Sequence, residues 1–374
     1  MSDHQRINLF TDHDVSRLHR GGGVIDLGAR RLHLPAIFGF CGGVLSALRK
    51  LNRAIEENAG RQIWLLGEVI HNATVNRAFA DAGVRILPET ELERVFDLAA
   101  PDAQVVIPAF GLPKNLDERL RRRFSQSGQI LDTTCGYVRR IWSFAKRTAA
   151  EGRTVVIHGK PAHPETRAIL SRALTDDNAV LLIRTVEQAH LLSAAIRHRD
   201  VERYPADLVR RKERVRLDLL ALVNQTTMLC SETRVIEQRL KEASREAGSD
   251  LVCCNAVCRA TQMRQDAAIE ICRQDCDMVL VVGGFTSSNT TQLYRLAASY
   301  CPTYFIGGAD ALTSERIYHF VPESGRMKTT LDWLTPDVQD IGILAGASCP
   351  ACDIGDVIRR LKELNEKNGQ PADR

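Results

Sequence analysis

The stretch MVLVVGGFTSSNTTQLYRLAASY (278–300) contains the pattern that decides the fold. An apolar run of strand length, 278–284, ends at a pair of glycines, and a helix is predicted over 289–300. Serine and asparagine immediately before a helix cap its unpaired N–H groups. A helix N-terminus that follows a strand end can bind phosphate in any α/β protein. The stretch therefore predicts one strand–helix unit with an anion-binding turn.

The same alternation recurs along the chain. Helix-length segments lie at 43–57, 73–83, 137–151, 231–246, 260–274, 289–300 and 353–366. Short apolar runs predict strands at 62–70, 103–109, 128–132, 154–159, 179–184, 218–224, 278–284, 303–307 and 341–346. Nearly continuous apolar strands separated by helices are typical of parallel sheets that are covered on both faces. The fold class is therefore predicted to be α/β.

Length and charge exclude several classes of protein. A chain of 374 residues is long enough for two or three domains, and 44% hydrophobic with 26% charged residues excludes wholesale disorder. The net charge is only +4, so we expect no nucleic-acid partner. Because no apolar run could span a bilayer and the N-terminus lacks a signal-peptide core, we expect a cytoplasmic protein without a membrane partner.

The chain has eleven cysteines, which without an export signal suggest metal, cluster or redox chemistry. Cys272, Cys276 and Cys301 lie among apolar residues, where packing in the core is predicted. Three others, Cys41, Cys135 and Cys258, each follow an apolar run and open a predicted helix. The dipole and unpaired N–H groups of a helix N-terminus favour a thiolate and an anionic cluster.

The spacing of these three cysteines predicts an open metal position. They lie 94 and 123 residues apart, which fits one cysteine in each of three lobes. Three ligands leave one iron of a four-iron cluster without a protein ligand, and a substrate can bind there.

One segment, 197–216, interrupts the alternation with a high density of arginine and lysine. It is predicted to be a solvated loop or helix. The alternative is a landing surface for an acidic electron carrier, because steering depends on charge of one sign.

Eight short motifs carry a resemblance to the IspH/LytB family of 4-hydroxy-3-methylbut-2-enyl diphosphate reductases. They occur in the family's order and span about residues 36–365: GFCGGV (39–44), EVIHN (68–72), DTTC (132–135), AHPE (162–165), NQTT (224–227), CRATQMRQ (258–265), SSN (287–289) and AGAS (345–348). The resemblance implies three similar α/β lobes with mainly parallel sheets, in a pseudo-threefold arrangement around a central [4Fe–4S] cluster. It also implies a small-molecule diphosphate substrate and a ferredoxin- or flavodoxin-type electron donor.

The resemblance assigns roles to individual residues. Cys41, Cys135 and Cys258 match the cluster ligands, Glu165 matches the proton donor, and Thr226 matches the hydroxyl that relays or orients the proton. Substrate-binding residues are implied at His71, His163, Gln225, Ser287, Ser288, Asn289 and Ser348. Asn72 is predicted to cap the helix that follows it.

Domain boundaries follow from the motifs and the alternation. We expect an N-terminal extension over 1–34 and a tail over 367–374. The lobes are predicted at 35–128 with Cys41, at 129–247 with Cys135 and the basic segment, and at 248–366 with Cys258.

One departure from the family pattern concerns the substrate pocket. The family's Ala-His-Gly reads Ala109-Phe110-Gly111, so an apolar ring replaces a histidine that can donate to diphosphate. Losing such a charge-assisted hydrogen bond costs about 1.5–3 kcal/mol. Two hypotheses follow: a divergent reductase that tolerates Phe110, or a paralogue that uses the same cluster to reduce a different substrate. A non-catalytic iron–sulfur sensor and a zinc protein are further alternatives.

The sequence leaves more than one role possible for four other cysteines. Cys349 and Cys352 form a Cys-x-x-Cys pair that would suit packing, a redox or assembly role, or an altered cluster. Cys253 and Cys254 could replace Cys258 as a ligand, although the following Arg264-Gln265 favours Cys258.

Overall fold

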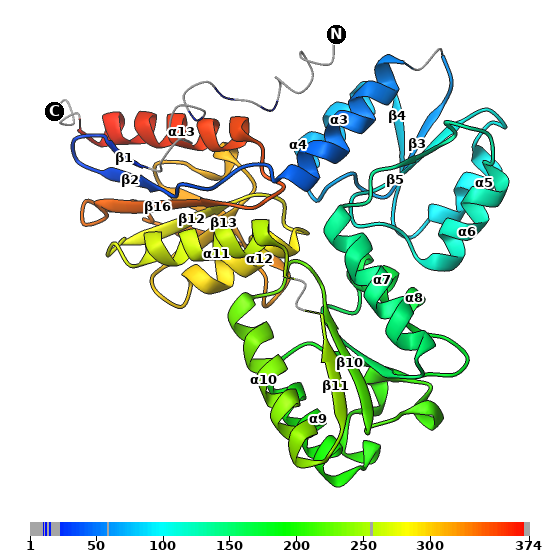
Figure 1. The fold of residues 1–374 in the computed structure, drawn as a ribbon. Coiled ribbons are helices and arrows are strands. Elements are labelled where there is room, and N and C mark those ends of the chain that lie inside the picture. Colours follow the sequence, from blue (N-terminus) through cyan, green and yellow to red (C-terminus); the bar gives the residue numbers. More distant parts are fainter. Residues whose placement is uncertain are drawn as a thin grey trace. The chain divides into compact units, whose positions relative to one another are not determined.

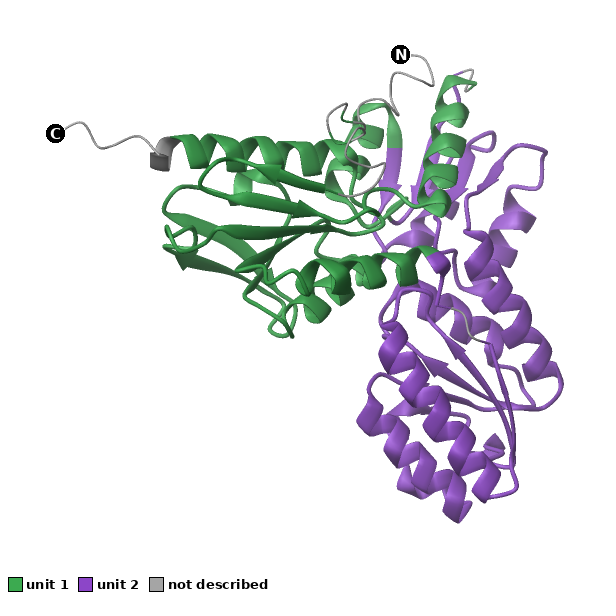
Figure 2. Cartoon of the chain, turned by 60° about the vertical axis from the view of Figure 1, so that its left-hand side comes forward, with its two compact units in different colours: residues 1–58, 68–84, 260–374 green, residues 59–67, 85–259 purple. Residues whose placement is uncertain are grey.

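The computed structural model describes residues 23–57, 60–254 and 257–369, together with Phe10, Asp12 and Val15. Within these residues it is an α/β fold with three sheets (Figure 1). The chain divides into two compact units, 1–58 with 68–84 and 260–374 (unit 1), and 59–67 with 85–259 (unit 2) (Figure 2).

Unit 1 contains a seven-stranded sheet in the order β1-β2-β16-β12-β13-β14-β15. Its central pairs are parallel, and antiparallel pairs lie at the two edges. The strands are β1 (Gly23–Asp26), β2 (Arg31–Leu34), β12 (Met278–Val282), β13 (Thr303–Ile306), β14 (Arg316–Val321), β15 (Arg326–Leu331) and β16 (Asp340–Ala345). The helices are α3 (Gly42–Glu56), α4 (Ala73–Asp81), α11 (Arg259–Cys272, of which Arg259 falls in unit 2), α12 (Ser288–Ala297) and α13 (Ala351–Gly369).

Both faces of the seven-stranded sheet are covered, as the apolar runs predicted. Figure 1 shows α13 on one face and α11 with α12 on the other. Met278, Leu280 and Val282 of β12 belong to the core cluster that includes α13. Val279 and Val281 belong to the cluster that includes α11 and α12. Successive side chains of a strand point to opposite faces, so a strand between two helical layers is apolar throughout.

Unit 2 contains the two smaller sheets, in the orders β11-β10-β7-β8-β9 and β4-β3-β5-β6. The five-stranded sheet is parallel except where β9 joins its edge. The strands are β3 (Ile63–Leu66), β4 (Val84–Leu87), β5 (Gln104–Ile107), β6 (Ile130–Asp132), β7 (Thr154–His158), β8 (Val180–Ile183), β9 (Val209–Arg210), β10 (Leu219–Asn224) and β11 (Asp250–Cys253). The helices are α5 (Val95–Leu98), α6 (Lys114–Arg123), α7 (Gly136–Ala150), α8 (Pro164–Ala173), α9 (Val186–His198) and α10 (Cys230–Glu246).

The predicted strands and helices are confirmed, with ends that differ by a few residues. The strand predicted over 62–70 ends at Leu66 because Gly67 takes a φ of +87° and turns the chain. The short elements β1, β2, β4, β9, β11, β14 and β15 and the helices α5, α6, α8 and α9 were not among the predicted elements. Among these, β1, β2, β4, β9 and β11 have four residues or fewer and are too short to show a period of their own.

Strand pairing moves the expected boundaries of the lobes. Residues 23–34 are not an extension, because β2 pairs in parallel with β16 and brings Leu32 opposite Ile341. The rest of that extension lies outside the described residues apart from Phe10, Asp12 and Val15, as do residues 370–374 of the tail. β6 pairs with β5, and β11 pairs with β10. These two strands were expected to begin the next lobes, after residues 128 and 247, but each belongs to the sheet of the preceding lobe.

The basic segment 197–216 is partly packed and largely neutralised. It contains the end of α9, three short 3-10 turns and β9, and it buries Tyr204, Leu208 and Val209 in the core. Carboxylates pair with five of its cations: Arg197, Arg203, Arg211, Lys212 and Arg216. The prediction of a solvated loop or helix holds for most of the segment, which is exposed or half-buried, while three apolar side chains anchor it in the core.

Among the described helices, none combines the length and the apolar character needed to cross a bilayer.

Candidate active site

A buried carboxyl group in unit 2 is held by one threonine. Glu165 lies in the first turn of α8 and is only 2% exposed. Thr226, just after β10, donates its N–H to Oε1 at 2.7 Å and its hydroxyl to Oε2 at 2.8 Å. The structure thus brings together the two residues predicted to handle the proton, although they are 61 positions apart.

Burial controls the acidity of this carboxyl group. Removal from water disfavours the carboxylate and raises the pKa of Glu165 to about 7, against the opposing effect of the two bonds from Thr226. A carboxylic acid with a pKa near neutrality is half protonated at physiological pH and can donate its proton there. The Thr226 hydroxyl can accept a hydrogen bond from the protonated acid and donate one onward.

His163 and Phe110 lie beside this pair. His163 caps α8, because its Nδ1 accepts a hydrogen bond from the N–H of Glu165 at 3.1 Å. Since Nδ1 is an acceptor, a neutral His163 ring carries its proton on Nε2, ready to donate. The ring of Phe110 meets the His163 ring edge-on, with centroids 6.4 Å apart and an angle of 70°. The residue that departs from the family pattern therefore contacts a predicted substrate-binding residue.

Gln225 is fully buried and holds the loop before α8. Its Oε1 accepts hydrogen bonds from the N–H of Lys160 and the hydroxyl of Thr166, both at 3.1 Å. Its Nε2 donates to the Thr227 hydroxyl at 2.8 Å. These bonds fix the loop that carries His163 and Glu165.

Backbone bonds connect two of the predicted cluster cysteines to these residues. The N–H of Cys258 donates to the carbonyl of Thr226 at 3.1 Å, which puts the third cysteine next to the proton-handling pair. The N–H of Cys135 donates to the carbonyl of Ala109 at 2.8 Å, next to Phe110. Unit 2 thus gathers Cys135, Cys258 and five other predicted site residues: Phe110, His163, Glu165, Gln225 and Thr226.

Hydroxyl and amide groups gather in unit 1. Ser287 caps α12, with its hydroxyl accepting from the N–H of Thr290 at 3.3 Å. The Ser348 hydroxyl lies 3.2 Å from the Ser287 hydroxyl and 3.3 Å from the carbonyl oxygen of His71. Ser287, Ser288, Asn289 and Ser348 are all buried. The three segments predicted to bind diphosphate in this part of the chain are therefore adjacent, at a helix N-terminus that favours anions.

Cys41 and Asn289 both bind the loop after β16. The N–H of Cys41 donates to the carbonyl of Ala347 at 3.2 Å, and Asn289 Oδ1 accepts from the N–H of the same residue at 2.9 Å. Cys41 caps α3, and its sulfur accepts from the N–H of Val44 at 3.4 Å. The loop that carries Ser348 thus lies between the first cysteine and α12.

Two positioning contacts in unit 1 were not predicted. Glu68 Oε2 lies 2.8 Å from Nδ1 of His71. The sequence signal for this contact is the i,i+3 spacing of the glutamate and the histidine in EVIHN (68–72). Thr261, within CRATQMRQ, accepts from Nδ2 of Asn289 at 3.5 Å. Asn72 caps α4 as predicted, with Oδ1 accepting from the N–H of Val75 at 2.9 Å.

The three predicted cluster cysteines are half-buried, and each stands directly before a helix. Cys41 belongs to unit 1, and Cys135 and Cys258 belong to unit 2. The part of the chain that the structure describes contains no group of three or more His, Cys, Asp or Glu side chains already gathered as a metal site. The cluster ligands therefore remain a proposal.

Several other cysteines pack as thiols. Cys272 and Cys276 are buried in the core beside α11 and α12, as predicted, and Cys301 packs against them. Burial raises the pKa of Cys253 to about 11 and also raises that of Cys254. Both thiols are therefore less ready to ionise than a solvated cysteine.

Cys349 and Cys352 differ from each other. Cys349 is fully buried in the core that includes α13, and burial raises the pKa of its thiol. Cys352 is half-buried, and its sulfur lies 3.7 Å from Oδ1 of Asp353. The environment of Cys349 favours packing among the three readings of this pair.

Replacing Cys349 with serine is expected to lower the thermal unfolding midpoint by about 2–12 °C. A serine hydroxyl buried without an adequate partner costs about 1–3 kcal/mol, and 1 kcal/mol corresponds to roughly 2–4 °C in a unit of this size. Cys352→Ser is the matched control and should shift the midpoint by about 1 °C or less, since its half-buried site tolerates a hydroxyl. Equal shifts in calorimetry would contradict a packing role specific to Cys349.

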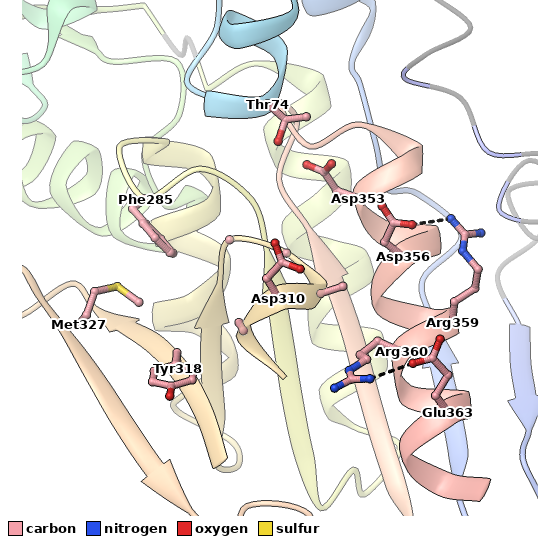
Figure 3. Close-up of a pocket in the computed structure, with 14 residues that line it drawn as sticks. Thr74, Phe285, Asp310, Tyr318, Met327, Asp353, Asp356, Arg359, Arg360 and Glu363 are labelled. Carbon is pink, nitrogen blue, oxygen red and sulfur yellow. Dashed lines mark hydrogen bonds and ion pairs between the residues drawn. The ribbon is translucent and has the colours of Figure 1, made fainter. Parts of the chain in front are cut away.

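A cavity of about 830 Å³ opens elsewhere in unit 1. Figure 3 shows Phe285, Tyr318 and Met327 on one side and α13 on the other, where Asp356 pairs with Arg359 and Arg360 with Glu363. Asp353 also lines it, and Asn72 donates to this carboxyl at 3.4 Å. None of the predicted site residues lines this cavity.

Comparison with known proteins gives a consistent result. The family model described as LytB protein matches residues 33–362. The 4-hydroxy-3-methylbut-2-enyl diphosphate reductase of Picosynechococcus sp. is 32% identical, over 91% of this chain and 85% of the relative. The enzyme of the same name from Synechococcus sp. is also 32% identical, over 94% of this chain and 89% of the relative.

Solved structures agree on the fold. The E-1-hydroxy-2-methyl-but-2-enyl-4-diphosphate reductase from Plasmodium falciparum superposes with a TM-score of 0.67 at 20% identity, covering 88% of this chain and 86% of that one. A structure of (E)-4-hydroxy-3-methyl-but-2-enyl diphosphate reductase gives a TM-score of 0.54 at 24% identity, covering 89% of this chain and 99% of that one. At these identities the likeness shows a shared α/β fold.

Proposed function

Because the chain belongs to the LytB protein family, we propose that it is an oxidoreductase that removes the allylic hydroxyl of 4-hydroxy-3-methylbut-2-enyl diphosphate. Two electrons and two protons are consumed for each substrate. The C–O bond breaks, the hydroxyl leaves as water, and a new C–H bond gives isopentenyl or dimethylallyl diphosphate. The observation that carries this proposal is the buried Glu165 held by Thr226.

Glu165 and Thr226 handle the proton. Hydroxide is a poor leaving group, so the oxygen must be protonated as it departs. Glu165 holds that proton at its carboxyl group, since burial raises its pKa to about 7. Thr226 fixes both carboxyl oxygens and offers a hydroxyl through which the proton can pass. These two side chains would be superfluous in a protein that only senses redox state, so they support an enzyme over a sensor.

The serines, the asparagine and the histidines bind and orient the diphosphate. Ser287, Ser288 and Asn289 stand at the N-terminus of α12, where N–H groups and the helix dipole favour phosphate oxygens. Ser348 is held against Ser287 and can donate to the same anion. His71 is oriented by Glu68, and His163 by its bond from the N–H of Glu165. The bonds of Gln225 favour a positioning role for that residue.

Cys41, Cys135 and Cys258 would hold a [4Fe–4S] cluster. Their chemistry fits: each is half-buried at the start of a helix, where the dipole stabilises a thiolate and an anionic cluster. When bound, such a cluster supplies electrons one at a time and, with three protein ligands, an iron that can polarise the substrate oxygen. A ferredoxin- or flavodoxin-type protein is the proposed electron donor.

Steady-state turnover of 4-hydroxy-3-methylbut-2-enyl diphosphate with a chemical reductant tests the proposal. The expected result is formation of the two isomeric diphosphates by anaerobically purified, cluster-loaded protein. Absence of product from protein with about four irons and four sulfides per chain would overturn this substrate assignment. One zinc per chain would instead identify a zinc protein.

Phe110 favours a second candidate, a reductase of the same chemistry for a less charged or larger substrate. Its buried ring lies against His163 where the family has a histidine that can donate to phosphate. In that case the protein would reduce an allylic alcohol without a diphosphate better than the diphosphate itself. A comparison of kcat/KM for the two substrate classes separates the candidates.

Replacing Phe110 with histidine is expected to lower KM for the diphosphate by about tenfold or more. A restored charge-assisted hydrogen bond contributes about 1.5–3 kcal/mol, and each 1.4 kcal/mol corresponds to about a factor of ten. Phe110→Leu is the control, because it removes the ring without adding a donor. Steady-state kinetics on both variants would contradict the prediction if histidine and leucine had the same effect.

A further inference from the structure

One helix of unit 2, α7, presents four cations on its exposed face. α7 begins directly after Cys135, and Arg139, Arg140, Lys146 and Arg147 are all exposed on it. The helix contains no aspartate or glutamate. Tyr137, in its first turn, is 42% exposed. The outer face of α7 is therefore basic with an aromatic side chain at the end nearest Cys135.

Two of these cations lie near the start of the helix and two near its end. The N-terminal end of a helix carries partial positive charge, so Arg139 and Arg140 lie where the dipole disfavours a cation, whereas Lys146 and Arg147 lie toward the end that favours one. Arg139 is compensated by an ion pair with Asp132 at 2.8 Å. Within the described residues, Arg140 and Lys146 have no ion pair, and Arg147 reaches Glu151 only at 3.9 Å. Arg140 and Lys146 therefore contribute positive charge that no carboxylate of the described residues neutralises.

The α7 face also lies close to the proposed ligand segments of unit 2. Burial raises the pKa of the Cys254 thiol, while the guanidinium groups of Arg140 and Arg147 oppose this effect, which places both arginines near Cys254. Cys258 follows four residues later, and its N–H is bonded to Thr226. Arg147 lies over the Phe144 ring, 5.2 Å from its centroid, which orients the guanidinium group.

The sequence offered a different basic surface, 197–216, and the structure argues against it. Five of its cations already have carboxylate partners, and Arg199 and Arg210 donate to backbone carbonyls. Paired charges contribute little to the field that steers an approaching protein. On α7, by contrast, Arg140 and Lys146 are exposed and have no ion pair among the described residues.

We infer that the exposed face of α7, formed by Tyr137, Arg139, Arg140, Lys146 and Arg147, is the docking surface for a small acidic one-electron carrier protein. This inference rests on the proposed function, because it assumes that electrons enter next to Cys135 and Cys258. Each reduced carrier gives up one electron and leaves oxidised, so two carriers dock in succession for every C–O bond broken. Complementary charge accelerates such encounters and makes them sensitive to salt.

A binding measurement tests the inference. Cluster-loaded protein is titrated with a plant-type [2Fe–2S] ferredoxin of strongly negative charge, at low and at high ionic strength. The double variant Arg140→Glu with Arg147→Glu is expected to raise Kd at least tenfold at low salt, with little difference at high salt. Arg140→Lys keeps the charge and should bind like the wild type. Iron and sulfide content of the reversed variant itself reports whether it is still folded.

Arg214→Glu is the matched control, since Arg214 is an exposed arginine of the 197–216 segment. Its Kd should equal that of the wild type. A larger effect of Arg214→Glu than of the α7 variant would overturn the inference, as would an unchanged Kd for the α7 variant. Binding of duplex DNA to this face without binding of ferredoxin would also overturn it.

A second readout separates this inference from the proposed function. The ratio of ferredoxin-driven to dithionite-driven turnover is expected to fall at least fivefold in the α7 variant. If dithionite supports no turnover of the diphosphate while ferredoxin binding still depends on α7, the docking surface stands and the substrate assignment falls. If dithionite supports turnover and the ratio is unchanged, the docking surface falls and the reaction stands.

Discussion

Replacing Glu165 with glutamine is expected to lower kcat by about 10²–10⁴-fold, the usual contribution of a positioned general acid. Glutamine keeps the shape of the side chain and can still accept from the N–H of Thr226, but it has no acidic proton to give. KM for the diphosphate should change little, because glutamine keeps the size of the side chain and its bond from Thr226, and the proton is needed in the chemical step rather than in binding. Steady-state kinetics with dithionite measure both constants.

The pH dependence of the same variant identifies the group. With its pKa raised to about 7 by burial, Glu165 loses its proton as the pH rises above neutrality. The wild-type kcat should therefore fall above about pH 7, and Glu165→Gln should lack this limb of the profile. Thr226→Ser keeps the relaying hydroxyl and is the conservative control, whereas Thr226→Val removes it. A glutamine variant within threefold of wild-type kcat would remove Glu165 from the mechanism.

Glu165 also links folding to pH, independently of any substrate. Its pKa is about 7 in the folded protein against an ordinary value of 4.5, so the folded state binds this proton more tightly. Between pH 4.5 and 7 the unfolded chain releases the proton first, and stability falls as the pH rises. The full difference is about 3 kcal/mol, since each pKa unit is worth about 1.4 kcal/mol. Unfolding of Glu165→Gln should lose this part of the pH dependence.

Replacing Cys258 with serine is expected to abolish cluster binding and turnover together. Iron–sulfur clusters are held by thiolates, and a serine hydroxyl does not ionise in the same way. The measurement is iron and sulfide per chain in anaerobically purified protein, expected to fall from about four of each to near zero. Loss of the visible charge-transfer absorption should accompany the loss of iron.

Cys253→Ser is the matched control for this experiment. Burial raises the pKa of Cys253 to about 11, so its sulfur is a thiol under all ordinary conditions. Its replacement should leave the iron content unchanged. If Cys253→Ser lost the iron and Cys258→Ser kept it, the third ligand would be Cys253, and the bond from the Cys258 N–H to Thr226 would be only structural.

Local patterns were sufficient for most of the fold. The run at 278–284 and the serines after it predicted β12 and α12, and Ser287 caps that helix as expected. β2 could not be predicted in this way, because a strand of four residues is too short to show a hydrophobic period. It is a strand because it pairs with β16. The predicted extension over 1–34 failed at residues 23–34 for this reason.

Charge is equally hard to judge from one segment. By sequence alone, residues 197–216 form a basic segment. In the structure, carboxylates such as Asp176 and Glu246 pair with its arginines. Asp176 and Glu246 lie 21 or more residues outside the segment, so the neutralisation is invisible to a local reading.

Local sequence was enough to predict the α/β class, the helix starts that carry Cys41, Cys135 and Cys258, and the position of Glu165 after a histidine and a proline. These features depend on hydrophobic period and capping, which act over a few residues. The folded chain adds three features: Thr226 binds Glu165 with two hydrogen bonds, burial raises the pKa of Glu165, and Phe110 packs against His163. Burial and pairing depend on groups distant along the chain, and no local pattern contains them.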